Sequence, residues 1–98
     1  MRRTLAVAAA LLFASWVAAG TTGVRIALDW TPNTNHTGIF AAIDLGYFAE
    51  EGLEVEVLEP SPVVSLQLVA SGRADFAVSS QEYVTMARAE GVPIVSIA

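Results

Sequence analysis

The chain has 98 residues, which leaves room for one domain at most. It contains no cysteine, so disulfides and thiolate metal ligands are excluded. Ten acidic residues stand against five basic ones, and a surface of this charge repels phosphate backbones. We therefore expect no nucleic-acid partner.

Residues 1–19 have the pattern of an export signal. Arg2 and Arg3 give a positively charged start, residues 5–17 form an apolar run, and small residues precede Gly20. A membrane-spanning helix needs about 20 apolar residues, which is longer than this run. We expect a signal peptide over residues 1–19 and a periplasmic mature chain without stable membrane insertion.

The first expected strand and helix flank a polar loop. Residues 24–30 alternate apolar and polar side chains as a strand does, and the loop follows at residues 31–36. Thr37 is a candidate N-cap for a helix with apolar residues at helical spacing, and Gly46 offers a left-handed position to end it. Residues 53–58 alternate Leu or Val with Glu, which predicts a strand at the edge of a sheet.

A second helix and a third strand are expected next. Ser61 and Pro62 fit an N-cap followed by proline at the first helical position, and Gly72 closes this helix. Residues 74–78 are short and mostly apolar, which predicts another strand.

A third helix and a fourth strand complete the pattern. Ser79 and Glu82 fit a capping box, with a helix running to about Glu90 and a strand expected at residues 93–98. The resulting βαβαβαβ order predicts an α/β fold with a parallel sheet and right-handed crossovers.

Ligands of such sheets bind at the carboxyl ends of the strands, which here are followed by residues 29–37, 60–61 and 79–82. In the first of these loops, Trp30 could stack on a flat ring while Asn33 and Asn35 match its polar atoms. The alternative is an ordinary loop in which both Asn side chains satisfy backbone groups.

The last of these loops also allows two interpretations. The capping box between Ser79 and Glu82 explains these residues structurally. Alternatively, the Ser80 hydroxyl and the free amides of the helix start could bind the polar edge of a ligand.

We predict no metal site, no cofactor and no catalytic residue. His36 is the only histidine, and no group of His, Asp and Glu has ligand-like spacing. Its simplest interpretation is a polar residue beside a helix N-cap rather than a direct ligand contact. The sequence also lacks a supported Ser/His/Asp arrangement, a P-loop and a dinucleotide-binding glycine motif.

Several segments together resemble a known family. They read LDWTPNTNHTG, GYF, EGL, SGRADF and AEGVP, at residues 28–38, 46–48, 51–53, 71–76 and 89–93. The resemblance is to the thiamine-pyrimidine family, which joins bacterial periplasmic receptors for formylaminopyrimidine to fungal pyrimidine synthases. It covers residues 24–98, and the first segment is the most specific. The GYF, EGL and SGRADF segments are shared more widely with sulfonate and nitrate receptors.

The resemblance implies a type II periplasmic-binding fold, in which two α/β lobes close on a ligand. Family members are considerably longer, so residues 20–98 are expected to be the N-terminal part of the first lobe. The implied function is the solute-binding component of an ABC importer, with a permease and an ATPase as partners. Its ligand would be formylaminopyrimidine or hydroxymethylpyrimidine. The ligand-binding positions carried over are Asp29, Trp30, Asn33, Asn35, His36, Ser79, Ser80 and Glu82.

Two other functions stay open at this point. The synthases of this family use a lysine that holds pyridoxal phosphate and a histidine that serves as substrate. Those positions align with Ser79 and Tyr83, neither of which supplies an amine or an imidazole. The other alternative is an alkylsulfonate or nitrate receptor, but Arg25, Arg73 and Arg88 do not follow a predicted strand end.

Overall fold

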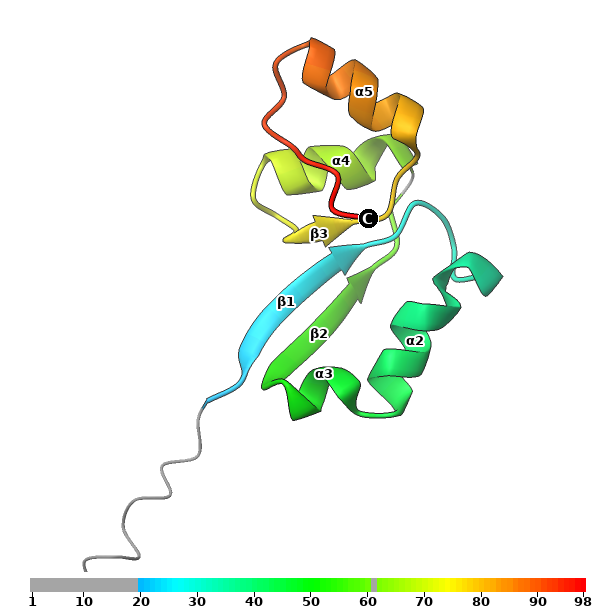
Figure 1. Ribbon diagram of the computed structural model, residues 1–98, viewed down its shortest axis with the longest axis vertical. Helices are drawn as coiled ribbons and strands as arrows, with labels where there is room; N and C mark the ends of the chain where they lie inside the picture. The colour runs from blue at the N-terminus through cyan, green and yellow to red at the C-terminus, as the bar shows by residue number, and fades with distance from the viewer. Residues whose placement is uncertain (1–19, 61) are drawn as a thin grey trace, which may run out of the picture.

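The computed structural model describes residues 20–98 apart from Ser61. The expected signal peptide and the expected Ser61 N-cap lie outside the described residues. Among the described residues, no helix is long and apolar enough to cross a bilayer. The elements in chain order are β1 (Thr22–Ala27), the 3₁₀ helix η1 (Thr34–His36), α2 (Thr37–Asp44), α3 (Tyr47–Glu50), β2 (Leu53–Leu58), α4 (Pro62–Ala70), β3 (Phe76–Ala77) and α5 (Gln81–Ala89) (Figure 1).

The three strands form one parallel sheet in the order β2-β1-β3. The pairing of β1 with β2 runs over six residues of each strand, whereas β3 pairs with β1 only at Phe76 and Ala77. In Figure 1, α2 and α3 lie beside β2, and α4 and α5 lie beyond β3. The predicted α/β class, the parallel sheet and the edge position of β2 are confirmed.

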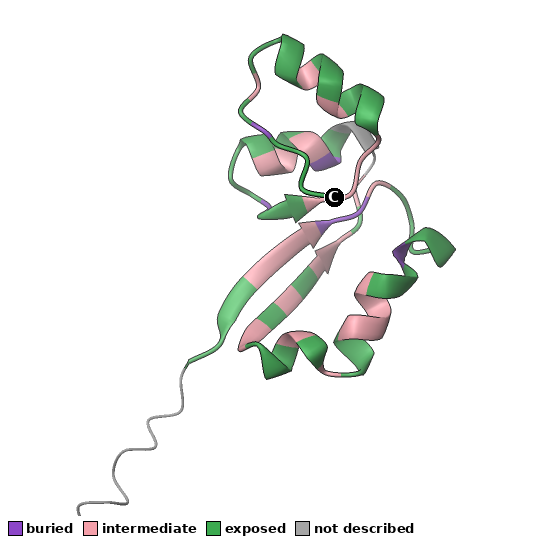
Figure 2. Cartoon of the chain, in the orientation of Figure 1, coloured by how far each residue is buried: buried purple, intermediate pink, exposed green. Residues whose placement is uncertain are grey.

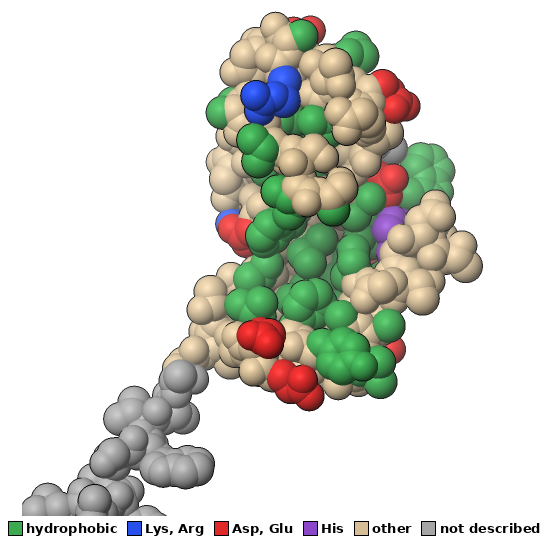
Figure 3. All heavy atoms as spheres, viewed as in Figure 1, with side chains coloured by type: hydrophobic (Ala, Val, Ile, Leu, Met, Phe, Trp, Pro, Cys, Tyr) green, Lys and Arg blue, Asp and Glu red, His purple; other side chains and the backbone are tan. Residues whose placement is uncertain are grey.

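The apolar face of the sheet follows from the register of β1 and β2. Val24 lies opposite Val55 and Ile26 opposite Val57, so these side chains share one face. All four are half-buried (Figure 2), and hydrophobic side chains gather over the two strands in Figure 3. Among the residues whose burial is described, the buried apolar core is small, and its members are Ala27, Leu28, Ala74 and Ile94.

The first predicted helix is divided into two helices, α2 and α3, and the 3₁₀ turn η1 precedes them. Asn33 is the N-cap of η1 and His36 is the N-cap of α2, so the expected Thr37 cap is wrong. The Thr37 hydroxyl instead donates to the carbonyl oxygen of Thr34 at 2.7 Å. Gly46 has a φ of 76°, a left-handed value that glycine adopts readily, and it separates α2 from α3. The predicted ending position is therefore confirmed.

The first and third strands are shorter than their alternation suggests. β1 ends at Ala27 rather than at residue 30, because the chain bends at Asp29 after the amide of Leu28 donates to Leu58 O at 2.8 Å. β3 has two residues rather than five. Its neighbours still contribute backbone bonds, since the Val78 amide donates to Ala27 O at 2.8 Å.

The expected fourth strand at residues 93–98 is wrong. A strand needs a neighbour for its amides, and the backbone bond recorded in this segment runs locally from Ile94 N to Val92 O at 2.9 Å. Ile94 is buried, but Val95 and Ile97 are 73% and 75% exposed. Alternation of apolar side chains alone did not decide the structure here, because no described strand pairs with the segment.

Candidate functional site

Two loops begin side by side at the carboxyl ends of β1 and β3. Ala27 and Ala77 are register partners, and the Val78 amide donates to Ala27 O. The chain continues to Asp29 after β1 and to Ser79 after β3. The structure therefore brings two of the predicted binding segments to one edge of the sheet, where ligands of parallel α/β sheets bind.

A buried histidine organises the first of these loops. His36 is 1% exposed, and its Nε2 lies 2.8 Å from Asp29 Oδ1. Its Nδ1 accepts a hydrogen bond from the backbone amide of Asn33 at 3.2 Å. His36 is itself the N-cap residue of α2, rather than the neighbour of the N-cap that the sequence predicted, and its side chain does not cap that helix. Both ring nitrogens therefore have partners within residues 29–36, and the ring stabilises the conformation of this loop.

The two asparagines of this loop differ in their surroundings. Asn33 Oδ1 accepts from the Asn35 amide at 2.9 Å, and Asn33 Nδ2 donates to Thr31 O at 2.9 Å. Asn33 therefore satisfies backbone groups, as one of the two interpretations of this loop expects. The side chain of Asn35 has no hydrogen bond to the described residues and is exposed.

Two further side chains of the first loop are accessible. Trp30 is 61% exposed, so its indole is not part of the buried core. The side chain of Asp29 is 36% exposed, and its Oδ2 has no hydrogen bond to the described residues. This carboxylate oxygen is open to an N–H donor.

The loop after β3 carries two buried hydroxyl groups. Ser79 Oγ and Ser80 Oγ are enclosed and have no hydrogen-bond partner among the described residues. The predicted capping box is wrong, because Ser80 rather than Ser79 is the N-cap of α5 and its side chain forms no capping bond. The third helical position is then Tyr83 instead of Glu82, and Tyr83 has no carboxylate to close the box. Glu82 is exposed.

The arginine side chains with recorded partners are bound at other places. The Arg25 guanidinium contacts Asp75 and Gly72 O. The backbone amide of Arg25 also donates to Asp75 Oδ2, and this bond, together with the side-chain bond from Arg25, lowers the pKa of the Asp75 carboxyl group. Arg88 donates to the carbonyl oxygen of Ile94. Arg73 lies in the turn before β3, at the opposite end of that strand from Ser79. At the predicted edge, the Asp29 carboxylate therefore has no arginine beside it in the sequence and no hydrogen bond from one.

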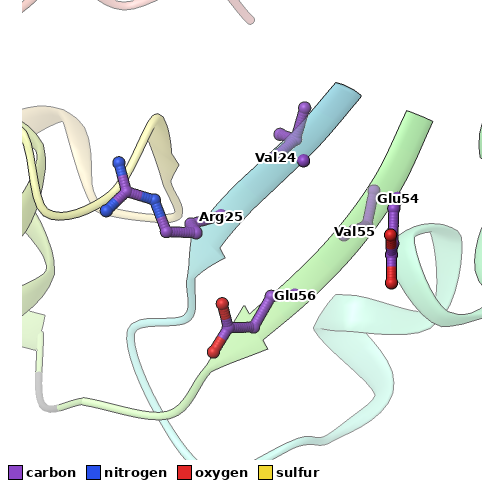
Figure 4. Close-up of a pocket in the computed structure, with 6 residues that line it drawn as sticks. Val24, Arg25, Glu54, Val55 and Glu56 are labelled. Atoms are coloured by element: carbon purple, nitrogen blue, oxygen red, sulfur yellow. The ribbon is translucent and has the colours of Figure 1, made fainter. Parts of the chain in front are cut away.

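One hollow in the described part of the chain lies away from this edge. It has a volume of about 580 Å³ and is lined by the middle of β1 and β2, where Arg25 extends toward the segment before β3 (Figure 4). A second hollow, of about 440 Å³, adjoins the site. Ser79 lines it together with Val78, Val84 and residues 93–98. The rule that ligands bind at strand ends did not predict this largely apolar hollow beside Ser79.

The contact between His36 and Asp29 was also missed by the sequence analysis. The two residues are seven positions apart, and the loop between them has no regular period from which a contact could be predicted. The reciprocal bonds of Asn33 and His36 resemble a capping box with histidine at its third position, where glutamate or glutamine is usual. That substitution conceals the signal.

Comparison with known proteins gives a consistent picture. The profile of the family described as NMT1/THI5 like matches residues 33–98. The formylaminopyrimidine-binding protein of Halalkalibacterium halodurans is 47% identical over 76 residues, which are 76% of this chain and 23% of that protein.

Enzymes are among the relatives as well. The 4-amino-5-hydroxymethyl-2-methylpyrimidine phosphate synthase THI5 of Saccharomyces cerevisiae is 36% identical over 76 residues, 76% of this chain and 22% of the enzyme. The synthase of the same name from Legionella pneumophila is 36% identical over 75 residues, 76% of this chain and 24% of the enzyme. The chain thus spans less than a quarter of the length of these three relatives.

Proposed function

We infer the function from one premise: this chain belongs to the NMT1/THI5-like family. We propose that the whole protein is the solute-binding component of an ABC importer and works with a permease and an ATPase. Its ligand is a pyrimidine precursor of thiamine, formylaminopyrimidine or hydroxymethylpyrimidine. Residues 20–98 then form part of the first lobe of a type II periplasmic-binding fold. The name of the Halalkalibacterium halodurans relative supports the choice of ligand.

The observation that carries this proposal is the set of unsatisfied polar groups at the strand ends. Asp29 Oδ2 has no hydrogen bond to the described residues and belongs to a side chain that is 36% exposed, and the hydroxyl groups of Ser79 and Ser80 are buried without partners among those residues. Buried polar groups without hydrogen bonds destabilise a protein, so a bound ligand that pairs with them is favoured. A carboxylate accepts from an exocyclic amine, and a hydroxyl group donates to a ring nitrogen.

The charge of this edge argues against a sulfonate or nitrate ligand. An anion would need a cation or several free donors, whereas the acidic group here is Asp29. Arg25 and Arg88 have partners elsewhere, and Arg73 lies at the other end of β3. An uncharged or cationic amine suits this site better.

The synthase alternative needs an amine that forms a Schiff base with pyridoxal phosphate. The 98 residues contain no lysine. The positions that the resemblance assigns to the synthase's lysine and histidine hold Ser79 and Tyr83. Homology to the synthases therefore supports a shared pyrimidine-binding scaffold, and we do not extend it to their chemistry.

The periplasmic location rests on the sequence pattern of residues 1–19. Expression of the whole protein in a Gram-negative host, followed by osmotic-shock fractionation and N-terminal sequencing, tests it. We expect a periplasmic product that begins at Gly20. A cytoplasmic product that retains Arg2 and Arg3 would contradict the location without affecting the ligand assignment.

The ligand assignment is tested by calorimetry on the whole protein as its gene encodes it. The panel contains formylaminopyrimidine, hydroxymethylpyrimidine, taurine and nitrate. We expect binding of at least one pyrimidine and of neither anion. Heat with taurine or nitrate and none with either pyrimidine would contradict the proposal and favour the anion receptor.

A further inference from the structure

We propose that His36 is a positioning residue that fixes the carboxylate of Asp29, leaving Oδ2 to accept a hydrogen bond from an amino group on the ligand. The inference rests on the proposed function, because it assigns a ligand group to a residue of that site. It also makes a separate statement about the protonation of His36, which can be tested without a ligand.

The hydrogen bonds of His36 determine which ring nitrogen carries the proton. The backbone amide of Asn33 is a donor, so Nδ1, at 3.2 Å, has to be the acceptor. A proton on Nδ1 would point at this amide and break the bond. Nε2 then carries the proton and donates to Asp29 Oδ1 at 2.8 Å. His36 is therefore a neutral imidazole protonated on Nε2.

The surroundings of the ring keep it in this orientation. His36 is 1% exposed, and its backbone amide donates to Asn33 O at 3.0 Å while its Nδ1 accepts from Asn33 N. Asn33 Oδ1 binds the next amide of the turn, at Asn35. Turning the ring would break the Nδ1 bond to the Asn33 amide and the Nε2 bond to Asp29, so these two bonds keep the Nε2 donor in position.

A fixed donor on Oδ1 restricts the Asp29 carboxylate to one arrangement. Of its two oxygens, Oδ1 is bound to His36 and Oδ2 has no partner among the described residues. The Nε2–H group of the imidazole donates this hydrogen bond to the carboxylate. Asp29 therefore offers an anionic acceptor held in advance, which reduces the entropy lost on binding.

This arrangement predicts a preference among ligands. An amino group on the ring donates to Asp29 Oδ2, whereas an oxo group at the same place brings two acceptors together and leaves Oδ2 without a donor. The protein should therefore bind a 4-aminopyrimidine at least about tenfold more tightly than the matching 4-oxo compound. His36 contributes to this preference through Asp29, without touching the ligand.

Two substitutions at one position separate the two bonds of the ring. In His36→Asn, the amide oxygen can take the place of Nδ1 and keep the bond to Asn33, but no group reaches Asp29. In His36→Gln, the longer side chain can bring an N–H donor to Asp29 while the bond to Asn33 is lost. Asp29→Asn is the companion variant, and we expect it to fold because the Asp29 side chain is 36% exposed.

The affinities of these variants for formylaminopyrimidine and a 4-oxo analogue are measured by calorimetry on the whole protein. We expect His36→Asn to bind the amino compound at least about tenfold more weakly and the oxo compound nearly unchanged, and His36→Gln to keep most of the affinity. Adding His36→Asn to Asp29→Asn should cause no further loss, because both changes remove one interaction. Thermal melts of each variant identify any that does not fold.

Nitrogen-15 NMR of the labelled wild-type histidine, near neutral pH, supplies the ligand-free readout. We expect the signals of a neutral ring protonated on Nε2, and an imidazolium or a ring protonated on Nδ1 would overturn the inference. Equal losses for His36→Asn and His36→Gln, or equal losses for both ligands, would also overturn it. A wild-type protein that binds neither pyrimidine would instead overturn the proposed function, and with it the ligand role given to Asp29.

Discussion

Arg25 and Asp75 are joined through both their backbones and their side chains. The amide of Arg25 donates to Asp75 Oδ2 at 2.8 Å, and the amide of Asp75 donates to Arg25 O at 2.9 Å. The Arg25 guanidinium also donates to Asp75 and, at 2.9 Å, to Gly72 O. Since β3 has only two residues in register with β1, these bonds hold the start of β3 in place. They thereby help to position Ser79 at its other end.

This contact predicts that Asp75→Asn lowers the melting temperature by an amount that depends on pH. The hydrogen bonds from Arg25 lower the pKa of Asp75 in the folded state. The stabilisation is therefore complete above the ordinary aspartate pKa of about 4 and is lost as the pH falls through the lower folded value. The melting temperatures of the wild-type protein and of the Asp75→Asn variant, each measured on the whole protein, should differ by a few degrees near neutral pH and converge in acid.

The control for this experiment is Glu54→Gln, which removes an exposed carboxylate of β2 that has no recorded partner. It should change the melting temperature little at any pH. A wild-type protein and an Asp75→Asn variant that melt together at all pH values would show that the contact with Arg25 does not stabilise the fold.

Trp30→Ala should weaken binding of formylaminopyrimidine by about 1–3 kcal/mol, the range for stacking of a base on an aromatic side chain. The indole is 61% exposed, so the melting temperature of the free protein should hardly change. Tyr47→Ala is the matched control, because Tyr47 is an exposed aromatic residue at the start of α3. Unchanged affinity in Trp30→Ala would mean that the indole does not contact the ligand.

Replacing Ser79 or Ser80 by alanine should weaken ligand binding without lowering the stability of the free protein. Without partners among the described residues, they lose no recorded hydrogen bond when replaced by alanine, so the free protein should be as stable or slightly more stable. Ligand affinity should fall by about 0.5–1.5 kcal/mol for each hydroxyl group that binds it. Calorimetry and thermal melts of the two alanine variants measure both quantities.

Ser65→Ala provides the contrast to these variants. Ser65 is fully buried, and its hydroxyl group donates to Val78 O at 3.2 Å, so its loss should destabilise the protein by about 1 kcal/mol. If Ser79→Ala and Ser80→Ala destabilise the free protein to the same extent, their hydroxyl groups have structural partners, and the assignment to the ligand is wrong.

The protein should form no imine with pyridoxal phosphate in the cleft that contains Ser79. Neither Ser79 nor Tyr83 carries a primary amine, and the 98 residues include no lysine. Absorbance spectra with added pyridoxal phosphate, followed by borohydride reduction and peptide mapping, measure this. A reduced adduct mapped to a residue of this cleft would favour the synthase alternative.

Much of the fold followed from local patterns. The alternation of Leu or Val with Glu predicted β2 at its observed bounds, and Gly46 ends α2 in the left-handed conformation that its position indicated. Pro62 stands at the first position of α4 as expected. Such features depend on residues close in sequence, where side-chain period and backbone preference decide the structure.

The features that could not be predicted depend on partners elsewhere. Residues 93–98 have the composition of a strand, but no described strand pairs with them. The helix before Gly46 begins with a turn capped by Asn33, which binds His36 where a glutamate is usual. The candidate site was predicted as a set of strand ends, whereas the role of His36 depends on its contact with Asp29.

The final prediction concerns residues 20–98 expressed alone, which should not melt cooperatively or bind pyrimidine tightly. The buried apolar core of the described residues is small, and a single core gives only marginal stability to a domain of fewer than about 80 residues. Apolar side chains such as Phe76, Val95 and Ile97 are exposed. The segment also offers only the contacts of its own loops, whereas a closing receptor encloses its ligand from two sides.

Thermal melts followed by circular dichroism, with and without formylaminopyrimidine, compare this segment with the whole protein. The whole protein should melt in one transition that rises with ligand, because binding to the folded state stabilises it. The segment should show a broad change that the ligand does not shift, together with association in size-exclusion chromatography, since its apolar sheet face stays accessible. A sharp melt of the segment that moves upward at micromolar ligand would show that one set of strand ends suffices for binding. The contacts of Asp29, Ser79 and Ser80 would then account for most of the affinity.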